Sequence, residues 1–390
     1  MNQLSSKRIE SLDLLKGLVI IIMALDHTRD YFHYEAFYFD PTDPEKTNLA
    51  LFFTRWITHF CAPAFSLLAG TSAYLVGRRK SKNELCLFLL KRGLWLIIIE
   101  FTVVIFGWSF NIYFNSIGLL VIWSLGISMI FLAAIIYLPK KYILAFSLLM
   151  IFGHNILDYI SIEDNMLWSI IHERGRYVLF DTIKIRVVYP IIPWIGVMSF
   201  GYYLGTYYDK TIEAKKRQKS FIIIGSIAIL LFIIIRLINE YGNPKSWHSY
   251  DQFQQTMFSF MDPLKYPPSV TYLLMTLGPT IIFLGLAENV KGRLVGFISV
   301  FGKVPFFIYI IHIYVIHFFA MILAEITGFG WKSMILDDFV STQSQLVGFG
   351  INLWGVYLVW ISIILMLYPL CKRFSEYKLA HKEKWWLSYF

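Results

Sequence analysis

The stretch that decides the fold spans residues 9–30 and reads Ile-Glu-Ser-Leu-Asp-Leu-Leu-Lys-Gly-Leu-Val-Ile-Ile-Ile-Met-Ala-Leu-Asp-His-Thr-Arg-Asp. It begins polar, is apolar from Gly17 to Leu25, and then places Asp26, His27, Arg29 and Asp30 close together. A charge near the end of a membrane-spanning helix is costly unless it faces protein or water. The cluster therefore predicts a buried polar site, and histidine is the side chain best suited to proton transfer near neutral pH.

The composition of the whole chain is that of an integral membrane protein. Of its 390 residues, 57% are hydrophobic and only 16% are charged. Long apolar stretches recur along its length, which excludes an ordinary soluble domain. The three cysteines are scattered, so they indicate neither a disulfide framework nor a zinc site.

Apolar runs of about 20 residues mark candidate membrane spans. The sequence predicts ten of them, at residues 14–33, 51–76, 93–110, 117–138, 142–158, 187–208, 220–239, 269–288, 299–323 and 347–370. Loops are too short to hold a separate soluble domain. We therefore expect an all-α fold, a polytopic transmembrane helix bundle of about ten spans, in which residues 1–390 form a single domain.

Charge predicts the orientation of this bundle. Lysine and arginine concentrate in alternate loops, beginning with the N-terminal segment, whereas acidic residues gather in the intervening loops. This distribution follows the positive-inside rule and predicts that both termini are cytoplasmic. The net charge of +9 is then a consequence of topology, and a nucleic-acid partner is not expected.

The first and second spans are expected to build the site together. In this orientation His27 lies at the external end of the first span, and Arg55 and His59 lie at a similar depth in the second. Arg55 and His59 are four residues apart, so a regular helix puts them on one face. Packing of the two helices would gather two histidines, Asp26, Asp30 and an arginine. The alternative is ordinary ion pairing at the membrane interface, which is less favoured because histidine and aspartate are too short to snorkel well.

Further polar residues inside the spans are candidates for the same cavity. Glu100 lies within the third span, where an unpaired carboxylate is costly, and Asn111 closes its external end. His312 lies centrally in the ninth span and is either a site residue or a hydrogen-bonded core histidine. His312 and His317 are about 140° apart around a helix, so they cannot chelate one metal ion. No metal-binding motif is present in the sequence.

Several motifs carry a resemblance to a known family. They extend over nearly the whole chain and comprise Ser11–Gly17, Met23–Asp30, Ala62–Gly70, Tyr189–Met198, Tyr266–Ser269 and Gly302–Pro305. In this order they resemble the heparan-alpha-glucosaminide N-acetyltransferase-like catalytic domain family of multi-pass membrane proteins. The first two spans are also distantly similar to type-three membrane acyltransferases, where a histidine at the outer end of the first helix is regarded as catalytic. His27 matches that position.

The resemblance implies a membrane acyltransferase of the cell (inner) membrane. It would move an acyl group from cytosolic acyl-CoA to an extracytoplasmic sugar, amino-sugar or envelope glycan. The resemblance to the family implies that this group is acetyl. Catalysis is expected from His27, Asp26, Asp30 and His59, with Asp30 or a residue of another helix orienting the imidazole. The remaining candidates are Arg55, Arg29, Glu100, Asn111 and His312 for acceptor binding, and Arg78, Arg79, Lys91 and Arg92 for the acetyl-CoA phosphates. The basic group is equally explained as a positive-inside loop. No metal is expected, and a homodimer is left open.

Two other classes of protein compete with this interpretation. Buried histidine and aspartate also serve proton relays, so a proton-coupled small-molecule transporter is the main alternative. The absence of an obvious inverted repeat and the position of the cluster near one face argue against it. The second competing class is a non-catalytic membrane component of an envelope-assembly complex.

The predicted orientation is testable with reporter fusions. Fusions at Asn83, Lys216 and Ser375 are expected to report the cytoplasm. Fusions after Asp43, Asp164, Gly242 and Asp338 are expected to report the exterior, because the basic loops are retained inside. A consistent reversal would overturn both the orientation and the external placement of His27.

Overall fold

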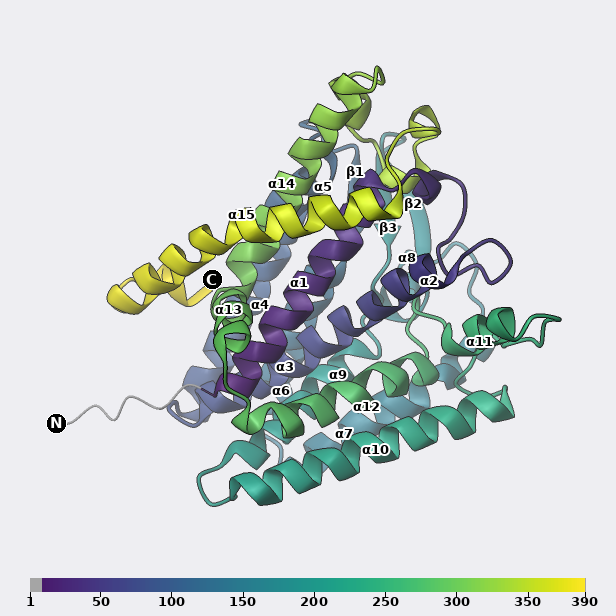
Figure 1. The fold of residues 1–390 in the computed structure, drawn as a ribbon. Helices are drawn as coiled ribbons and strands as arrows, with labels where there is room; N and C mark the ends of the chain where they lie inside the picture. Colours follow the sequence, from purple (N-terminus) through teal and green to yellow (C-terminus); the bar gives the residue numbers. More distant parts are fainter. Residues whose placement is uncertain (1–8, 390) are drawn as a thin grey trace.

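Apolar segments joined by short charged loops form a bundle of α-helices in the computed structural model, which describes residues 9–389 (Figure 1). The helices are α1 (Glu10–Phe32), α2 (Leu49–Trp56), α3 (Cys61–Gly77), α4 (Lys82–Ile99), α5 (Ile105–Ser109), α6 (Val121–Ile135), α7 (Lys140–Gly153), α8 (Met166–Ile171), α9 (Trp194–Leu204), α10 (Ala214–Ile238), α11 (Phe253–Met261), α12 (Val270–Leu286), α13 (Arg293–Lys303), α14 (Pro305–Ile326) and α15 (Leu353–Ala380). The expected helical bundle is confirmed in its main feature.

Within the described residues, six helical segments are long and apolar enough to cross a membrane. They are Leu49–Gly77, Lys140–Tyr159, Ala214–Ile238, Val270–Asn289, Pro305–Ile326 and Leu353–Ala380. α1 is not among them, although it occupies the middle of the bundle (Figure 1). In its C-terminal part Arg29 is buried and Asp26 and Asp30 are half-buried, an environment in which charged side chains are tolerated at membrane depth.

The backbone of α1 touches the backbone of α13. A Cβ atom added to Gly17 would lie 2.0 Å from the carbonyl oxygen of Ile298, and one added to Gly302 would lie 1.8 Å from that of Asp13. Only glycine permits so close an approach, which is a common way for helices to pack in membranes. This contact sets the position of α1 relative to the helix that follows α13.

A second glycine contact joins α3 to α9. A Cβ atom on Gly70 would lie 1.9 Å from the carbonyl oxygen of Met198, and one on Gly201 would lie 2.0 Å from that of Leu67. α3 also packs against α1 and α12. The short 3₁₀ segment Ile57–Phe60, which carries His59 and leads from α2 into α3, contacts α1 and α12.

The expected ninth span is two helices rather than one. α13 ends at Lys303, and α14 starts with Pro305 at its first position, with Val304 between them at φ −135° and ψ 50°. Proline fits the first turn of a helix because its missing N–H would have no partner there. The break changes the direction of the chain, so that α13 packs on α1 while α14 continues with His312.

Two other expected spans begin as strands, which departs from a purely α-helical fold. Residues 117–119 and 187 belong to a three-stranded sheet of β1 (Ser116–Leu119), β2 (Gly175–Leu179) and β3 (Ile183–Val187). The order is β1-β3-β2, with β1 parallel and β2 antiparallel to β3. The helices of these spans start only at Val121 and Trp194. Short apolar runs that contain isoleucine, leucine and valine occur in strands as well as in helices, so periodicity alone did not distinguish the two.

The glycine contact between α1 and α13 yields a prediction about stability. Gly302→Ala forces a methyl group against the Asp13 carbonyl and is expected to destabilise the protein by about 1–3 kcal/mol, as overpacking does. The melting temperature of the purified protein in detergent should fall.

Gly296→Ala is the matched control on the same helix. Nothing lies within 4 Å of a Cβ added there, so alanine should be neutral or stabilising by up to about 1 kcal/mol through helix propensity. Equal melting temperatures for the two variants would contradict the close approach.

Candidate active site

A polar cavity of about 170 Å³ lies at the C-terminal end of α1. Its ionisable lining residues come from separate parts of the chain: Asp26, His27, Asp30, Arg55, Lys265, Tyr189, Tyr266 and Tyr309. Apolar and aromatic groups, including Phe65 and Trp108, complete the wall. We call this space the His27 cavity.

His27 is held by a second histidine. Its Nδ1 lies 2.8 Å from Nε2 of His312, and its ring stands edge-on to Trp108 at a centroid distance of 4.7 Å. Nδ1 of His312 lies 2.8 Å from the carbonyl oxygen of Ile308, which can only accept. In the neutral pair, Nδ1 of His312 therefore carries a proton and its Nε2 accepts one from Nδ1 of His27.

This hydrogen-bond network leaves one basic nitrogen for chemistry. Nε2 of a neutral His27 has no proton, and within residues 9–389 it has no hydrogen-bond partner. A nitrogen lone pair that is oriented through the opposite ring nitrogen is the arrangement that general bases use. The orienting group is His312, a residue of another helix, and neither Asp26 nor Asp30 bonds to the imidazole.

The two carboxylates of α1 are paired with arginines. Arg29 donates to Asp26 at 2.9 Å and to Asp30 at 2.6 Å, and Arg55 donates to Asp26 at 3.0 Å. The expected meeting of the first and second spans is thus an Asp26–Arg55 contact. Breaking a buried ion pair leaves an uncompensated charge, which costs far more than the pair itself contributes. The network therefore specifies how the two spans pack.

His59 lies outside the His27 cavity. Its Nδ1 is 3.0 Å from the carbonyl oxygen of Trp56, and its Nε2 is 3.9 Å from Asp262. The regular helix α2 ends at Trp56 and a 3₁₀ segment follows, so Arg55 and His59 do not share a regular helical face. Arg55 enters the His27 cavity, while both residues line a smaller cavity of about 110 Å³.

This smaller cavity adjoins the His27 cavity and is rich in charge. Arg55, Lys265 and Tyr266 line both cavities. The further charged residues of the smaller cavity are Arg174, Lys245, Asp40 and Asp262. Burial raises the pKa of Asp262, even though Lys245 pairs with it. Burial opposes the ionisation of Tyr266, but the charges of Lys265 and Arg55 prevail and lower the pKa of its hydroxyl.

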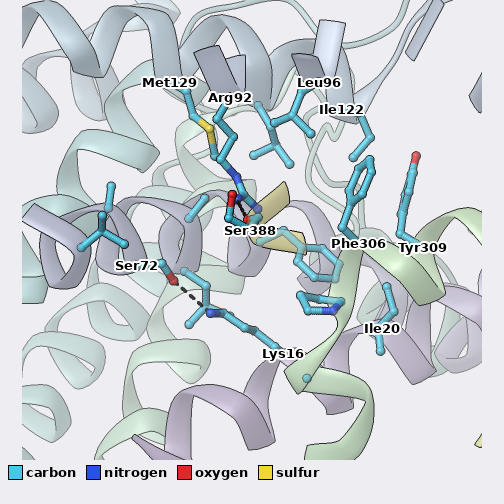
Figure 2. Close-up of a pocket in the computed structure, with 18 of the residues that line it drawn as sticks. Lys16, Ile20, Ser72, Arg92, Leu96, Ile122, Met129, Phe306, Tyr309 and Ser388 are labelled. Carbon is cyan, nitrogen blue, oxygen red and sulfur yellow. Dashed lines mark hydrogen bonds between the residues drawn. The ribbon is translucent and has the colours of Figure 1, made fainter. Parts of the chain in front are cut away.

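A larger cavity of about 290 Å³ lies toward the opposite end of α1 (Figure 2). Its basic lining residues are Lys16, Arg92, Lys303 and Lys378, and within residues 9–389 no acidic residue lines it. The interior is mostly apolar. Figure 2 shows Lys16 bonded to Ser72, at 2.9 Å, and Arg92 bonded to the carbonyl of Ser388. We call this space the basic cavity.

The two large cavities share part of their walls. Phe65 of α3, Val121 of α6 and Tyr309 of α14 line both the basic cavity and the His27 cavity. Lys16 and Asp30 are fourteen residues apart on α1, which corresponds to about 21 Å along a helix. The three shared residues, which we call the partition, therefore lie where the two spaces adjoin, between opposite ends of α1.

Two expected site residues have structural partners elsewhere. The carboxylate of Glu100 accepts a hydrogen bond of 2.9 Å from the backbone N–H of Trp123, in the first turn of α6. It caps that helix from a neighbouring one, which satisfies an N–H that the helix itself cannot. Asn111 donates to Asp337 at 2.8 Å. Neither residue lines the His27 cavity.

The basic residues expected to hold acetyl-CoA phosphates are divided by the fold. Only Arg92 lines the basic cavity. Arg78 donates to the carbonyl of Tyr208 at 2.9 Å, and Arg79 and Lys91 are exposed outside it. Arg92 shares the basic cavity with three lysines from other helices: Lys16 of α1, Lys303 of α13 and Lys378 of α15. Because these four residues lie far apart in the sequence, the sequence alone did not predict that they line one cavity.

Sequence reasoning also missed Trp108, Lys265, Tyr266 and Tyr309. Tyr309 precedes His312 by three residues, a spacing that puts both on one side of α14 and that could have suggested it. Lys265 and Tyr266 lie in the loop before α12; Tyr266 belongs to one of the motifs that carry the resemblance, but neither residue was named as a site residue. The described residues contain no group of three or more histidine, cysteine, aspartate or glutamate side chains placed to hold a metal ion.

Comparison with known protein families supplies a match. A family model described as heparan-alpha-glucosaminide N-acetyltransferase, catalytic, matches residues 8–237, more than half of the chain. The matched part carries His27 and Arg55, whereas Tyr309 and His312 lie beyond it. No curated protein matches this chain.

Proposed function

The chain belongs to the heparan-alpha-glucosaminide N-acetyltransferase catalytic-domain family, and on that premise we propose that it is an acyl-CoA-dependent membrane acyltransferase. It takes an acyl group, acetyl in the simplest case, from acyl-CoA in the cytoplasm. It transfers this group to an extracytoplasmic sugar, amino-sugar or envelope glycan. The proposed location is the cell (inner) membrane.

The observation that carries the proposal is the pair of cavities that adjoin at the partition. A transferase that works across a membrane needs a donor site and an acceptor site near opposite faces, with the reacting atoms meeting between them. The basic cavity and the His27 cavity fit this need, because they lie near opposite ends of α1 and share Phe65, Val121 and Tyr309.

The basic cavity is the proposed donor site. Acyl-CoA has anionic phosphates and a long thin arm that ends in the thioester. Arg92 and the three lysines provide positive charge for the phosphates, and guanidinium groups bind phosphate oxygens with directed hydrogen bonds. The apolar interior of the cavity suits the arm and the acyl group. In this arrangement the thioester reaches the partition next to His27.

His27 is the proposed general base, or a transient carrier of the acyl group. Its unprotonated Nε2 would take the proton from the attacking amine or hydroxyl of the acceptor. His312 holds the imidazole through Nδ1, in the way that a third group orients the base of a catalytic triad. Asp26, Asp30, Arg29 and Arg55 form the charged floor of the acceptor site, and His59 supports its outer edge.

The donor site is tested by the affinity for acetyl-CoA. Arg92→Gln removes a charge-assisted hydrogen bond, which is worth about 1.5–3 kcal/mol. We therefore expect the dissociation constant of acetyl-CoA to rise about tenfold or more, measured by calorimetry on the purified protein.

Arg79→Gln is the control for Arg92→Gln. It removes the same charge from an exposed position outside the basic cavity, so affinity should be nearly unchanged. An equal loss in both variants would mean that only the general positive charge of the loop matters. Tight binding in Arg92→Gln would refute this donor site.

The role of His27 is tested by turnover. His27→Ala should lower the rate of acetyl transfer to glucosamine, or of acetyl-CoA hydrolysis, by about 10²–10⁴-fold, which is typical of a lost general base. Binding of acetyl-CoA should persist, because the donor is held in the other cavity.

Two further variants separate the histidines. His59→Ala should have a smaller effect, since this residue lies outside the His27 cavity. His312→Gln retains a hydrogen-bonding side chain and should shift the pH profile of the rate more than it lowers binding. Full activity in His27→Ala, together with loss in His312→Ala, would assign the chemistry to α14.

A further inference from the structure

Tyr309 occupies a special position in the partition. It projects from α14 one helical turn before His312, and their ring centroids are 5.9 Å apart. Its side chain lines both the basic cavity and the His27 cavity. Figure 2 shows it beside Phe306 at one edge of the basic cavity. Of the three partition residues it is the only one with a polar group.

Within the described residues the hydroxyl of Tyr309 has no protein partner, and the side chain borders both cavities. The residue is 6% exposed, and within residues 9–389 its hydroxyl makes no hydrogen bond. By contrast, the hydroxyl of the buried Tyr272 donates to the carbonyl of His59 at 2.7 Å, and that of the half-buried Tyr314 donates to the carbonyl of Val103 at 2.6 Å. A hydroxyl that borders a cavity and has no protein partner can donate a hydrogen bond to a molecule bound there.

The position of this hydroxyl matches the path of the reacting group. A thioester that extends from the basic cavity toward His27 must pass the partition, and its carbonyl oxygen then lies within the space that Tyr309 borders. The side chains of Phe65 and Val121 cannot donate a hydrogen bond to that oxygen. Tyr309 is the one partition residue able to donate to it.

We propose that Tyr309 is a catalytic residue whose hydroxyl donates a hydrogen bond to the carbonyl oxygen of the acyl thioester. This inference rests on the proposed function and names the group that activates the donor. A fixed donor aimed at an oxygen that becomes negative stabilises the transition state more than the ground state. His27 and Tyr309 would then act on the two reactants from α1 and α14.

Acyl transfer forms one bond to the acceptor and breaks the C–S bond of the thioester. The acceptor nitrogen or oxygen attacks the carbonyl carbon, forms the new bond and sends an electron pair to the carbonyl oxygen, where Tyr309 holds the charge. His27 takes the proton of the acceptor through Nε2. When the intermediate collapses, the C–S bond breaks. The sulfur takes the proton from His27, and CoA leaves as the thiol. The products are the acylated acceptor and free CoA.

Tyr309→Phe removes only the hydroxyl and keeps the ring in the partition. We expect kcat for acetyl transfer or hydrolysis to fall by about 10²–10³-fold, as for loss of one oxyanion donor. The dissociation constant of acetyl-CoA should change little. Tyr314→Phe is the matched control on the same helix, because its hydroxyl bonds to backbone away from both cavities; it should keep kcat near that of the parent.

An infrared measurement tests the hydrogen bond without turnover. Acetyl-CoA labelled with ¹³C at the carbonyl is bound to the full-length protein, and the carbonyl stretch is read as an isotope-edited difference. Binding to the parent and to Tyr314→Phe should lower the frequency of this stretch, and binding to Tyr309→Phe should abolish the lowering.

The outcomes separate this inference from the function on which it rests. If the parent binds acetyl-CoA and lowers the frequency, and Tyr309→Phe does the same, Tyr309 is not the donor but the acyltransferase proposal stands. A kcat for Tyr309→Phe within threefold of the parent would also overturn the assignment. If the parent does not bind acetyl-CoA at all, both proposals fall.

Discussion

The direct contact between the backbones of α1 and α13 is the constraint on which the site depends. Gly17 and Gly302 have no side chain between them, so each helix meets a carbonyl oxygen of the other. Because Pro305 restarts the chain immediately after α13, fixing α13 also fixes the first turn of α14. His312 and Tyr309 then face the end of α1 that carries His27. A larger residue at either glycine would separate the helices that hold the two histidines together.

Charge pairing explains why so polar a cluster is stable inside an apolar bundle. Asp26 and Asp30 are matched by Arg29 and Arg55, so the network is close to neutral. Isolated ions at such depth are expensive, and the alternative to pairing is a change of protonation. Because of this pairing, the charged residues and His27 have different roles. The arginines and carboxylates hold the helices in register, which leaves His27 to bond to His312 and to keep its second nitrogen unoccupied.

Many of the same residue types are purely structural elsewhere in the molecule. Glu100 caps α6, and His154 bonds to the backbone carbonyl of Pro268 at 2.8 Å. His317 bonds to the carbonyl of Met334 at 2.7 Å, and Arg236 donates to the carbonyl of Phe260 at 2.8 Å. A buried polar residue in a helical bundle therefore has two ordinary explanations. It either satisfies a backbone group that a helix end or break leaves open, or it faces a cavity.

The sequence by itself determined the class of the protein, the helical bundle, the family and the cluster at the end of α1. These follow from local information: runs of apolar residues, loop charges, and motifs in which neighbours along the chain matter most. Only the tertiary structure decided that His312 bonds to His27, that Arg92 alone of the expected basic residues reaches the basic cavity, and that Glu100 and Asn111 lie outside the His27 cavity. It also placed Tyr309 in the walls of two cavities and His59 in the smaller cavity beside the His27 cavity. These outcomes depend on helix rotation and close backbone contacts between segments hundreds of residues apart, and periodicity within one segment carries no information about them.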